Sequence, residues 1–355
     1  MPWRRDLTEV GPLLQAWARE KVGPDAIVTN TSAPGNGMSS ETILFEMTVG
    51  GETERYCARL APMPDVFPVF ATYDIELQAK CMRLVRERTD VPAPDVRWVE
   101  LDTKWLGAQF LVMVRVDGEA PPDIPPYVFM GWVHEGTPEQ RAALQTNTLT
   151  ALSKIHTLNP GNADLSFLTR PERGDTPLRQ QLGHERWYYE WAREDQHYPL
   201  IERTFDWLEA NFPDEGDAVF NWGDARVGNV LYRDFAPVAV LDWEMATVGP
   251  REVDLAWMIF LHRFFNDLAQ RFEAPTMDDF LQRDAVIKEY EALSGHTVKN
   301  LEWFEVFAAQ RFAIVSVRTS TRSFAYGVQE RPDDLDDLIM FRGLQEAMLA
   351  GTYWD

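Results

Sequence analysis

The chain has 355 residues, a formal net charge of −22, 45% hydrophobic residues, 13 Trp and 20 Phe. This length predicts two domains or one large bilobal unit, and the aromatic content excludes an intrinsically disordered chain. The acidic balance argues against a nucleic-acid binder, because phosphate backbones are bound by clusters of Lys and Arg. This negative charge is typical of a solvated acidic surface. Alternatively, it attracts a cationic ligand toward the protein.

The two cysteines, Cys57 and Cys81, do not indicate a disulfide framework. They are too few for a set of disulfides in a chain of this size, and their spacing is not that of a zinc site. The first 20 residues contain a basic pair but no apolar core of signal-peptide length, and no stretch approaches the ~18 apolar residues of a membrane span. We therefore expect a cytoplasmic protein without a membrane partner, either a monomer or a homodimer.

The first third of the chain has the alternation of β-strands. Between Ile43 and Val49 apolar residues alternate with more polar ones, and Gly50-Gly51 after them is typical of a hairpin turn. The predicted elements, in order, are a helix at 6–20, strands at 26–33, 41–49 and 53–60, a helix at 73–85, and strands at 96–100 and 109–116. This third therefore predicts an antiparallel sheet that carries a helix, and a first domain of residues 1–116.

After residue 117 the apolar residues recur at helical spacing. Helices are predicted at 140–158, 178–193, 200–211, 254–269, 285–293 and 301–323. The proline-rich segment 121–126 is the expected joint, since proline disfavours helical backbone at and before itself. Residues 117–355 are therefore predicted as a second, mostly helical domain.

One stretch, residues 221–244, interrupts these helices with polar residues and two short apolar runs. Asn229 follows Asp224 by five positions, and the apolar runs between Asn229 and Asp242 predict a hairpin with these two residues at its open end. Mg²⁺ prefers oxygen ligands of this kind, and Asp224 could then accept a proton from a hydroxyl nucleophile. The arrangement is that of phosphoryl transfer in protein kinases. The alternative is an ordinary hairpin with acidic turns, since Asp and Asn are common turn residues.

Three motifs of the chain resemble a known family. They are WGDARVGN at 222–229, LDWE at 241–244 and DLA at 254–256. They resemble the motifs of the aminoglycoside phosphotransferase and choline-kinase group of small-molecule kinases, most closely the kinase-like domains fused to some acyl-CoA dehydrogenases. The resemblance covers most of the chain. It implies an α+β, bilobal protein-kinase-like fold, with a small antiparallel-sheet lobe for ATP and a larger, mostly helical lobe for the catalytic loop and the acceptor pocket.

The resemblance also implies roles for the polar residues of this stretch. Asp224 is expected to be the catalytic base, and Arg226 a cation that neutralises the transferred phosphate. Asn229 and Asp242 are expected to bind Mg²⁺, and Asp254 to hold the catalytic loop in place. The chain departs from the family at Trp222, where the family has a His that organises the loop.

The nucleotide is expected to be bound by the first domain. The turn at 34–42 resembles a family turn that covers ATP phosphates, although on its own it is equally a flexible surface turn. Arg59, in the segment ARLAP, stands where the family binds the α- and β-phosphates. The residues implied in nucleotide binding are Gly35, Gly37, Ser39, Ser40, Arg59, Glu76, Met113 and Arg115.

Within this set, Glu76 is the expected carboxylate partner of Arg59. It is favoured over Gln78, which occupies the commonest family register for the Glu but cannot form an ion pair. The alternative is that Glu76 is a solvated carboxylate at a helix start, where the helix dipole favours it. The backbone near Met113 and Arg115 is expected to hold adenine.

The acceptor is expected to be a hydroxyl-bearing small molecule, either aminoglycoside-like or of hydroxy-acid or acyl type. Glu244 and Trp257 flank the implied site and are the predicted acceptor contacts. One predicted helix contains three arginines, Arg311, Arg318 and Arg322. We interpret them as a solvated or salt-bridged face of the helix rather than as contacts with an anionic substrate. Two alternative functions stay open: a non-catalytic nucleotide-binding pseudokinase module and a metal-dependent phosphohydrolase.

Overall fold

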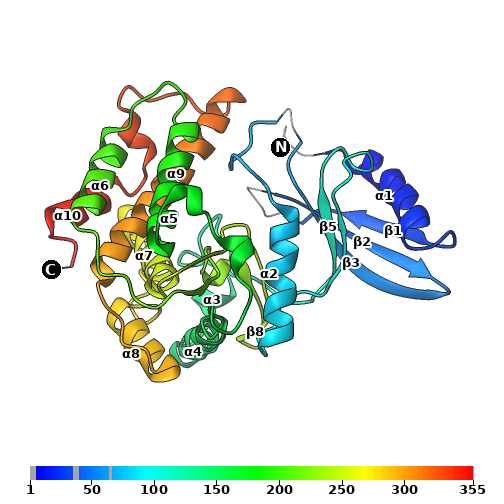
Figure 1. Cartoon of the computed structure of the whole chain (residues 1–355), viewed down its shortest axis with the longest axis horizontal. Helices are drawn as coiled ribbons and strands as arrows, with labels where there is room; N and C mark the ends of the chain where they lie inside the picture. Colours follow the sequence, from blue (N-terminus) through cyan, green and yellow to red (C-terminus); the bar gives the residue numbers. More distant parts are fainter. Residues whose placement is uncertain (1–4, 35–39, 64–65, 355) are drawn as a thin grey trace. The chain divides into compact units, whose positions relative to one another are not determined.

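The computed structural model describes residues 5–34, 40–63 and 66–354 (Figure 1). The chain divides into two compact units, one of Met1–Glu87 with Ala93–Val116 and one of Arg88–Pro92 with Asp117–Asp355. Within the described ranges, no helix is both long and apolar enough to cross a membrane. With an antiparallel sheet in the first unit and mostly helices in the second, the α+β prediction is confirmed.

The first unit is built around a five-stranded antiparallel sheet with the strand order β1-β2-β3-β5-β4. Its elements are α1 (Leu7–Lys21), β1 (Ile27–Ser32), β2 (Glu41–Val49), β3 (Glu52–Leu60), α2 (Ile75–Arg88), β4 (Val96–Glu100) and β5 (Phe110–Val114). Gly50 and Gly51 join β2 to β3 with φ of 60° and 87°. Glycine adopts this left-handed backbone at little cost, which explains the predicted hairpin turn.

The core of this unit lies between α1 and the sheet. Val10, Leu14 and Trp17 recur at helical spacing along α1 and are buried in one cluster with Phe45 of β2 and Phe110 of β5. The rings of Trp17 and Phe110 meet edge to face, with centroids 5.5 Å apart. The helix predicted at 6–20 therefore packs its apolar face against the sheet.

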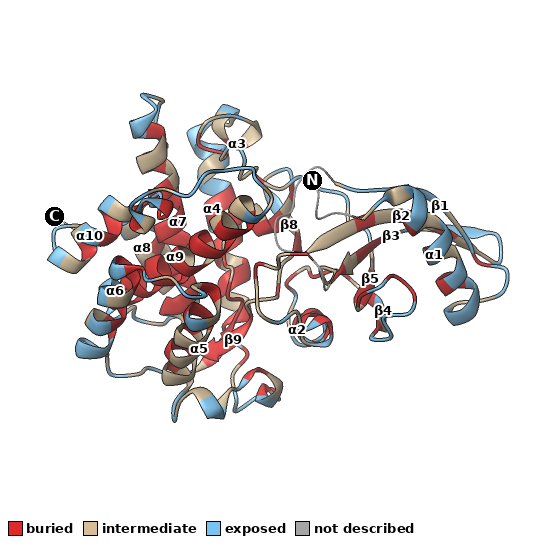
Figure 2. Cartoon of the chain, turned by 90° about the horizontal axis from the view of Figure 1, so that it is seen from above, coloured by how far each residue is buried: buried red, intermediate tan, exposed pale blue. Residues whose placement is uncertain are grey.

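The second unit is mostly helical. Its α-helices are α3 (Trp132–Glu135), α4 (Pro138–Ile155), α5 (Pro177–Ala192), α6 (Pro199–Ala210), α7 (Glu252–Arg271), α8 (Arg283–Ser294), α9 (Leu301–Ala325) and α10 (Arg342–Ala350). α7 packs against α9, and Figure 2 shows both helices buried along much of their length. The six predicted helices are confirmed with ends within three residues, whereas the short α3 and α10 were not predicted.

Two pairs of short strands interrupt these helices and frame the polar stretch. β6 (Val219–Asn221) pairs with β9 (Thr247–Gly249), and β7 (Val230–Arg233) pairs with β8 (Ala236–Val240). The hairpin of β7 and β8 was predicted. The β6–β9 pair was not, because three residues are too few to show an alternating pattern.

Candidate active site

The loop between β6 and β7 holds the predicted catalytic residues, and α7 anchors it. Asp254, fully buried in the first turn of α7, accepts hydrogen bonds from the backbone N–H groups of Trp222 (2.7 Å) and Gly223 (2.8 Å). His156 Nε2 lies 2.9 Å from the same carboxylate. Two backbone donors of the loop are thus satisfied by one buried side chain, so Asp254 holds the loop as expected.

Trp222, at the position of the family His, links this loop to the segment that contains Asp242. Its indole Nε1 donates to the carbonyl oxygen of Leu241 at 2.8 Å, and the side chain is buried. Its ring also packs near Trp243, with centroids 6.0 Å apart. The indole of Trp222, with one N–H donor and a large apolar ring, therefore connects the loop after β6 to the segment that contains Asp242.

The carboxylate of Asp224 is surrounded by donors. Asn229 Nδ2 donates to Oδ2 at 2.6 Å, while Arg226 Nε at 3.0 Å and Trp257 Nε1 at 2.6 Å both donate to Oδ1. The Asp224 side chain keeps 14% of its surface exposed. The structure thus brings three of the predicted residues into direct contact around a carboxylate that stays accessible.

Arg226 is held by two carboxylates rather than one. Besides its contact with Asp224, its Nη1 donates to Asp123 Oδ2 at 2.5 Å. Burial opposes the charge of the guanidinium, but the Coulombic attraction of Asp224 and Asp123 outweighs it and raises the pKa of Arg226. Asp123 belongs to the proline-rich segment that sequence reasoning treated only as a joint, and no local pattern marks it as part of the site.

Asn229 and Asp242 both lie at the open end of the hairpin, as the sequence predicted. The N–H of Leu241 donates to the carbonyl of Asn229 at 2.8 Å, next to the paired residues Val230 and Val240. Asp242 has φ of 60°, in the left-handed region that L-residues adopt at a cost of roughly 1–2 kcal/mol. Such backbone outliers cluster at functional sites, where the surrounding structure holds them.

The donor set at this hairpin end fits Mg²⁺. The amide nitrogen of Asn229 is engaged with Asp224, so its Oδ1 and the Asp242 carboxylate are the oxygen atoms that would hold the cation. Among residues 5–34, 40–63 and 66–354 there is no group of three or more His, Cys, Asp or Glu side chains that could hold a metal. A magnesium ion bound by these two residues would complete its shell with water and phosphate oxygens.

The predicted nucleotide residues belong to the first unit. Three of them lie outside the described residues: Gly35, Gly37 and Ser39. Ser40 directly precedes β2, and Arg59 lies on the central strand β3. Met113 is on β5, and Arg115 follows that strand with its N–H bonded to the carbonyl of Arg55 at 2.9 Å.

The contacts of Glu76 favour the alternative role considered for it. Its side chain is 53% exposed and forms an ion pair with Lys80 at 3.4 Å, one turn further along α2. Gln78 is the residue that faces the interior, and its amide has no hydrogen-bond partner among the described residues. These contacts are those of a solvated carboxylate at a helix start. The pairing of Glu76 with Arg59 stays a prediction.

The two predicted acceptor contacts differ in their surroundings. Glu244 is half-buried, two residues after Asp242. Trp257 is buried, and the only polar atom of its side chain, the indole Nε1, donates to Asp224. The position of Trp257 therefore favours a role in holding Asp224 over a direct contact with the acceptor.

Comparison with known proteins identifies the family. The model of the family described as "Phosphotransferase enzyme family" matches residues 31–296. The chain is 24% identical over 309 residues to the probable acyl-CoA dehydrogenase IBR3 of Arabidopsis thaliana; the match covers 81% of this chain and 35% of that protein. The chain thus spans about a third of the length of this relative.

Solved structures of similar fold are phosphotransferases. A putative aminoglycoside phosphotransferase from Ralstonia eutropha has a TM-score of 0.67 at 20% identity, covering 97% of this chain and 98% of that one. A thermostable mutant of the aminoglycoside phosphotransferase APH(4)-Ia, solved with AMP-PNP and hygromycin B, has a TM-score of 0.57 at 17% identity, covering 95% and 98%. The predicted resemblance and the predicted enzyme class are confirmed: the chain belongs to the phosphotransferase enzyme family.

Proposed function

We propose that the chain transfers the γ-phosphate of ATP to a hydroxyl group of a small molecule in a Mg²⁺-dependent reaction. The observation that supports this most directly is the Asp224 carboxylate, which accepts hydrogen bonds from Arg226 at 3.0 Å and from Asn229 at 2.6 Å on a loop anchored by Asp254. The fold neighbour APH(4)-Ia, whose complex contains AMP-PNP and hygromycin B, is consistent with ATP as the donor.

Each residue has a distinct task in this proposal. Asp224 orients the acceptor hydroxyl and takes its proton, which general bases do within hydrogen-bond distance of the reacting group. Arg226 provides a fixed positive charge beside the transferred group. Asn229 and Asp242 hold Mg²⁺, which when bound neutralises phosphate charge.

In the first unit, the proposal assigns nucleotide binding to residues at the sheet. Arg59 on β3 binds phosphate oxygens, and the backbone around Met113 and Arg115 binds adenine. The acceptor class in the proposal is broad, comprising aminoglycoside-like and hydroxy-acid or acyl-type alcohols, since membership of a fold family does not determine the substrate. We also propose a cytoplasmic location and no nucleic-acid partner, in line with the net charge of −22.

Calorimetric titration with AMP-PNP, with and without Mg²⁺, tests the metal site first. We expect Mg²⁺-dependent binding by the wild type and a loss of at least about tenfold in affinity for Asp242→Asn, because a neutral amide replaces a charged oxygen ligand. Asp234→Asn is the matched control. Asp234 lies at the turn of the same hairpin and also has a positive φ, of 50°, so the substitution changes the same chemistry away from the site.

A phosphate-transfer screen of alcohols then tests the reaction. Turnover by the wild type and its loss in Asp242→Asn are expected, with both proteins folded. Binding of AMP-PNP without transfer to any acceptor would instead indicate the pseudokinase module. Release of inorganic phosphate with no phosphorylated product would indicate the phosphohydrolase, and unchanged turnover in Asp242→Asn would refute the metal role.

A further inference from the structure

One face of α7 contacts both the backbone and the side chain of the catalytic loop. Asp254 and Trp257 are three residues apart, so their side chains lie on the same side of the helix. Asp254 binds the backbone of the loop, and Trp257 Nε1 donates to Asp224 Oδ1 at 2.6 Å. The indole N–H, bonded to a charged oxygen, is a strong and directional constraint on the orientation of this carboxylate.

Arg311 of α9 supports the same arrangement from a second helix. Its guanidinium stacks on the ring of Trp257, with Cζ 4.5 Å from the centroid, and its Nη2 donates to the carbonyl of Gly223 at 2.9 Å. Glu185 of α5 lies 3.5 Å from Nε and balances the charge. Arg311 is 3% exposed, so these contacts occur in a desolvated environment where a cation–π contact is strong.

The contacts around Asp224 also select one of its two oxygen atoms. A carboxylate has about four acceptor positions. Trp257 and Arg226 use two on Oδ1, and Asn229 uses one on Oδ2. Among the described residues this leaves one position on Oδ2, which is therefore the atom able to meet an acceptor hydroxyl.

We infer that Trp257 and Arg311 are positioning residues for the base: together they fix the Asp224 carboxylate so that Oδ2 faces the acceptor. This inference rests on the proposed function for its catalytic consequence, but the geometry it requires can be measured without any acceptor. The helices α7 and α9 thus contribute to the reaction through Asp224 rather than by touching the substrate.

The first test observes the hydrogen bond directly by NMR on the full chain labelled with ¹⁵N-tryptophan. The resonance lost in Trp257→Phe identifies the Trp257 indole. We expect this resonance far downfield because the indole N–H donates a hydrogen bond to a carboxylate. Asp224→Asn should move this resonance upfield, since an amide oxygen is a weaker acceptor, while Asp234→Asn should leave it in place. A resonance that is insensitive to Asp224→Asn, or that responds equally to both variants, would overturn the inference.

The second test uses catalysis with the best acceptor from the screen. Trp257→Phe keeps an aromatic ring and removes the N–H, and Arg311→Lys keeps the charge and removes the planar fork. Each should lower kcat about ten- to a hundredfold, the worth of one hydrogen bond to a charged group, with KM for ATP within about twofold.

Arg318→Lys is the matched control for Arg311→Lys. Arg318 lies two turns further along α9, is similarly buried at 5%, stacks on Trp191 with Cζ 4.0 Å from the centroid, and pairs with Glu194 at 2.9 Å. It should lose comparable stability while kcat and the Trp257 resonance stay unchanged. Equal kinetic effects of the two lysine variants would show a merely structural role.

The two tests separate this inference from the proposed function. If no alcohol is phosphorylated but the Trp257 resonance responds to Asp224→Asn and to Arg311→Lys, the proposed reaction fails and the positioning contacts stand. If turnover is found and the resonance does not respond, the reaction stands and the inference fails.

Discussion

At the scale of single residues, the candidate site depends on two backbone positions with positive φ. Gly223 has φ of 91°, and a Cβ there would lie 1.9 Å from the carbonyl oxygen of Met245. Asp242, with φ of 60°, adopts a similar backbone although it has a side chain. Steric exclusion thus requires glycine directly before the proposed base. At Asp242 the strained backbone is tolerated, and the residue there provides the carboxylate that the proposed metal needs.

Gly223→Ala is expected to damage both folding and nucleotide binding. The added methyl group meets backbone atoms of Met245 that cannot rotate away, so the free energy of unfolding should fall by more than about 3 kcal/mol. Denaturant titration gives this value, and AMP-PNP calorimetry on the folded fraction should show lost binding.

Gly295→Ala is the control that isolates the backbone contribution. Gly295 directly follows α8 as its C-cap with φ of 69°, and an added Cβ there meets no atom within 4 Å. Only the cost of a left-handed residue applies, about 1 kcal/mol. Similar losses for the two glycine variants would contradict the steric account of Gly223.

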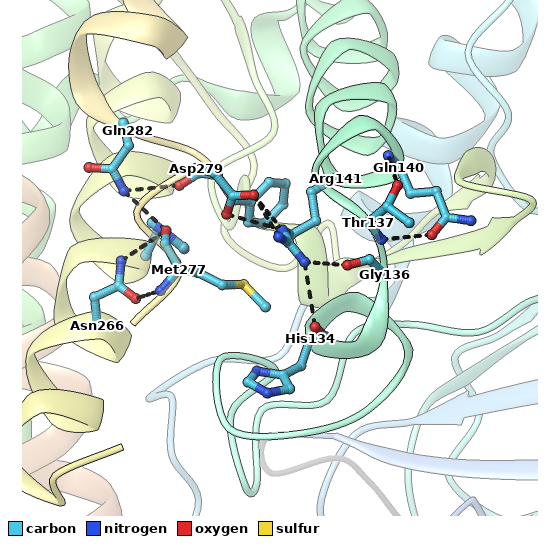
Figure 3. A network of polar contacts seen from close by, with 11 residues as sticks. His134, Gly136, Thr137, Gln140, Arg141, Asn266, Met277, Asp279 and Gln282 are labelled. Atoms are coloured by element: carbon cyan, nitrogen blue, oxygen red, sulfur yellow. Dashed lines mark hydrogen bonds and ion pairs between the residues drawn. The ribbon is translucent and has the colours of Figure 1, made fainter. Parts of the chain in front are cut away.

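At the scale of elements, Arg141 joins the start of α4 to two other segments of the second unit (Figure 3). Its Nε and Nη2 donate to the carboxylate of Asp279, at 3.0 and 2.6 Å. Its Nη1 donates to the carbonyl oxygens of His134 (3.4 Å) and Gly136 (2.5 Å), just before the helix. One planar side chain thus connects α3, α4 and the segment after α7, which the fork of donors on arginine allows and the single ammonium of lysine does not.

Arg141→Lys should therefore lower the free energy of unfolding by about 1–3 kcal/mol, since partly buried acceptors lose a charged donor. Arg203→Lys is the comparison, because Arg203 is 60% exposed and makes one long ion pair with Glu346 at 3.9 Å. That change should stay below about 0.5 kcal/mol, as for other exposed pairs. Urea denaturation of both variants measures the difference, and equal values would show that the network adds no stability.

At the scale of the whole molecule, one buried histidine, His262, and one half-buried histidine, His184, predict sensitivity to acid. Burial lowers the pKa of His262 to about 4, and its ring lies 2.8 Å from the Tyr127 hydroxyl. Burial, with the charges of three nearby arginines, lowers the pKa of His184 to about 3. Both rings are therefore neutral in the folded protein at pH values where an unfolded histidine, with a pKa near 6.5, is charged.

The sign of the pH dependence follows from proton counts. Between about pH 6.5 and 4 the unfolded chain binds more protons at these histidines than the folded chain, so their contribution to stability is lost as the pH falls. Each contributes a slope of at most about 1.4 kcal/mol per pH unit. Stability measured from pH 7 to 5 should fall less steeply in His262→Gln than in wild type. Parallel slopes for the two proteins would contradict this account.

Much of the fold could be predicted because its signals are local. The alternation from Ile43 to Val49, the Gly50-Gly51 turn and the helical spacing after residue 117 each depend only on neighbours in the sequence. The same holds for the hairpin of β7 and β8, which brings Asn229 to Asp242. The pair of β6 and β9 could not be predicted, because 25 residues separate strands of three residues each.

The sequence by itself determined the polar residues of the site, their order and the hairpin that unites them, since a turn and two short strands need no distant partner. Only the tertiary structure decided what holds them. Asp123 reaches Arg226 from 103 positions away, and Arg311 reaches Gly223 from 88 positions away. Such contacts arise when segments far apart in the sequence pack together, and packing depends on the shapes of whole surfaces rather than on the identity of any one residue.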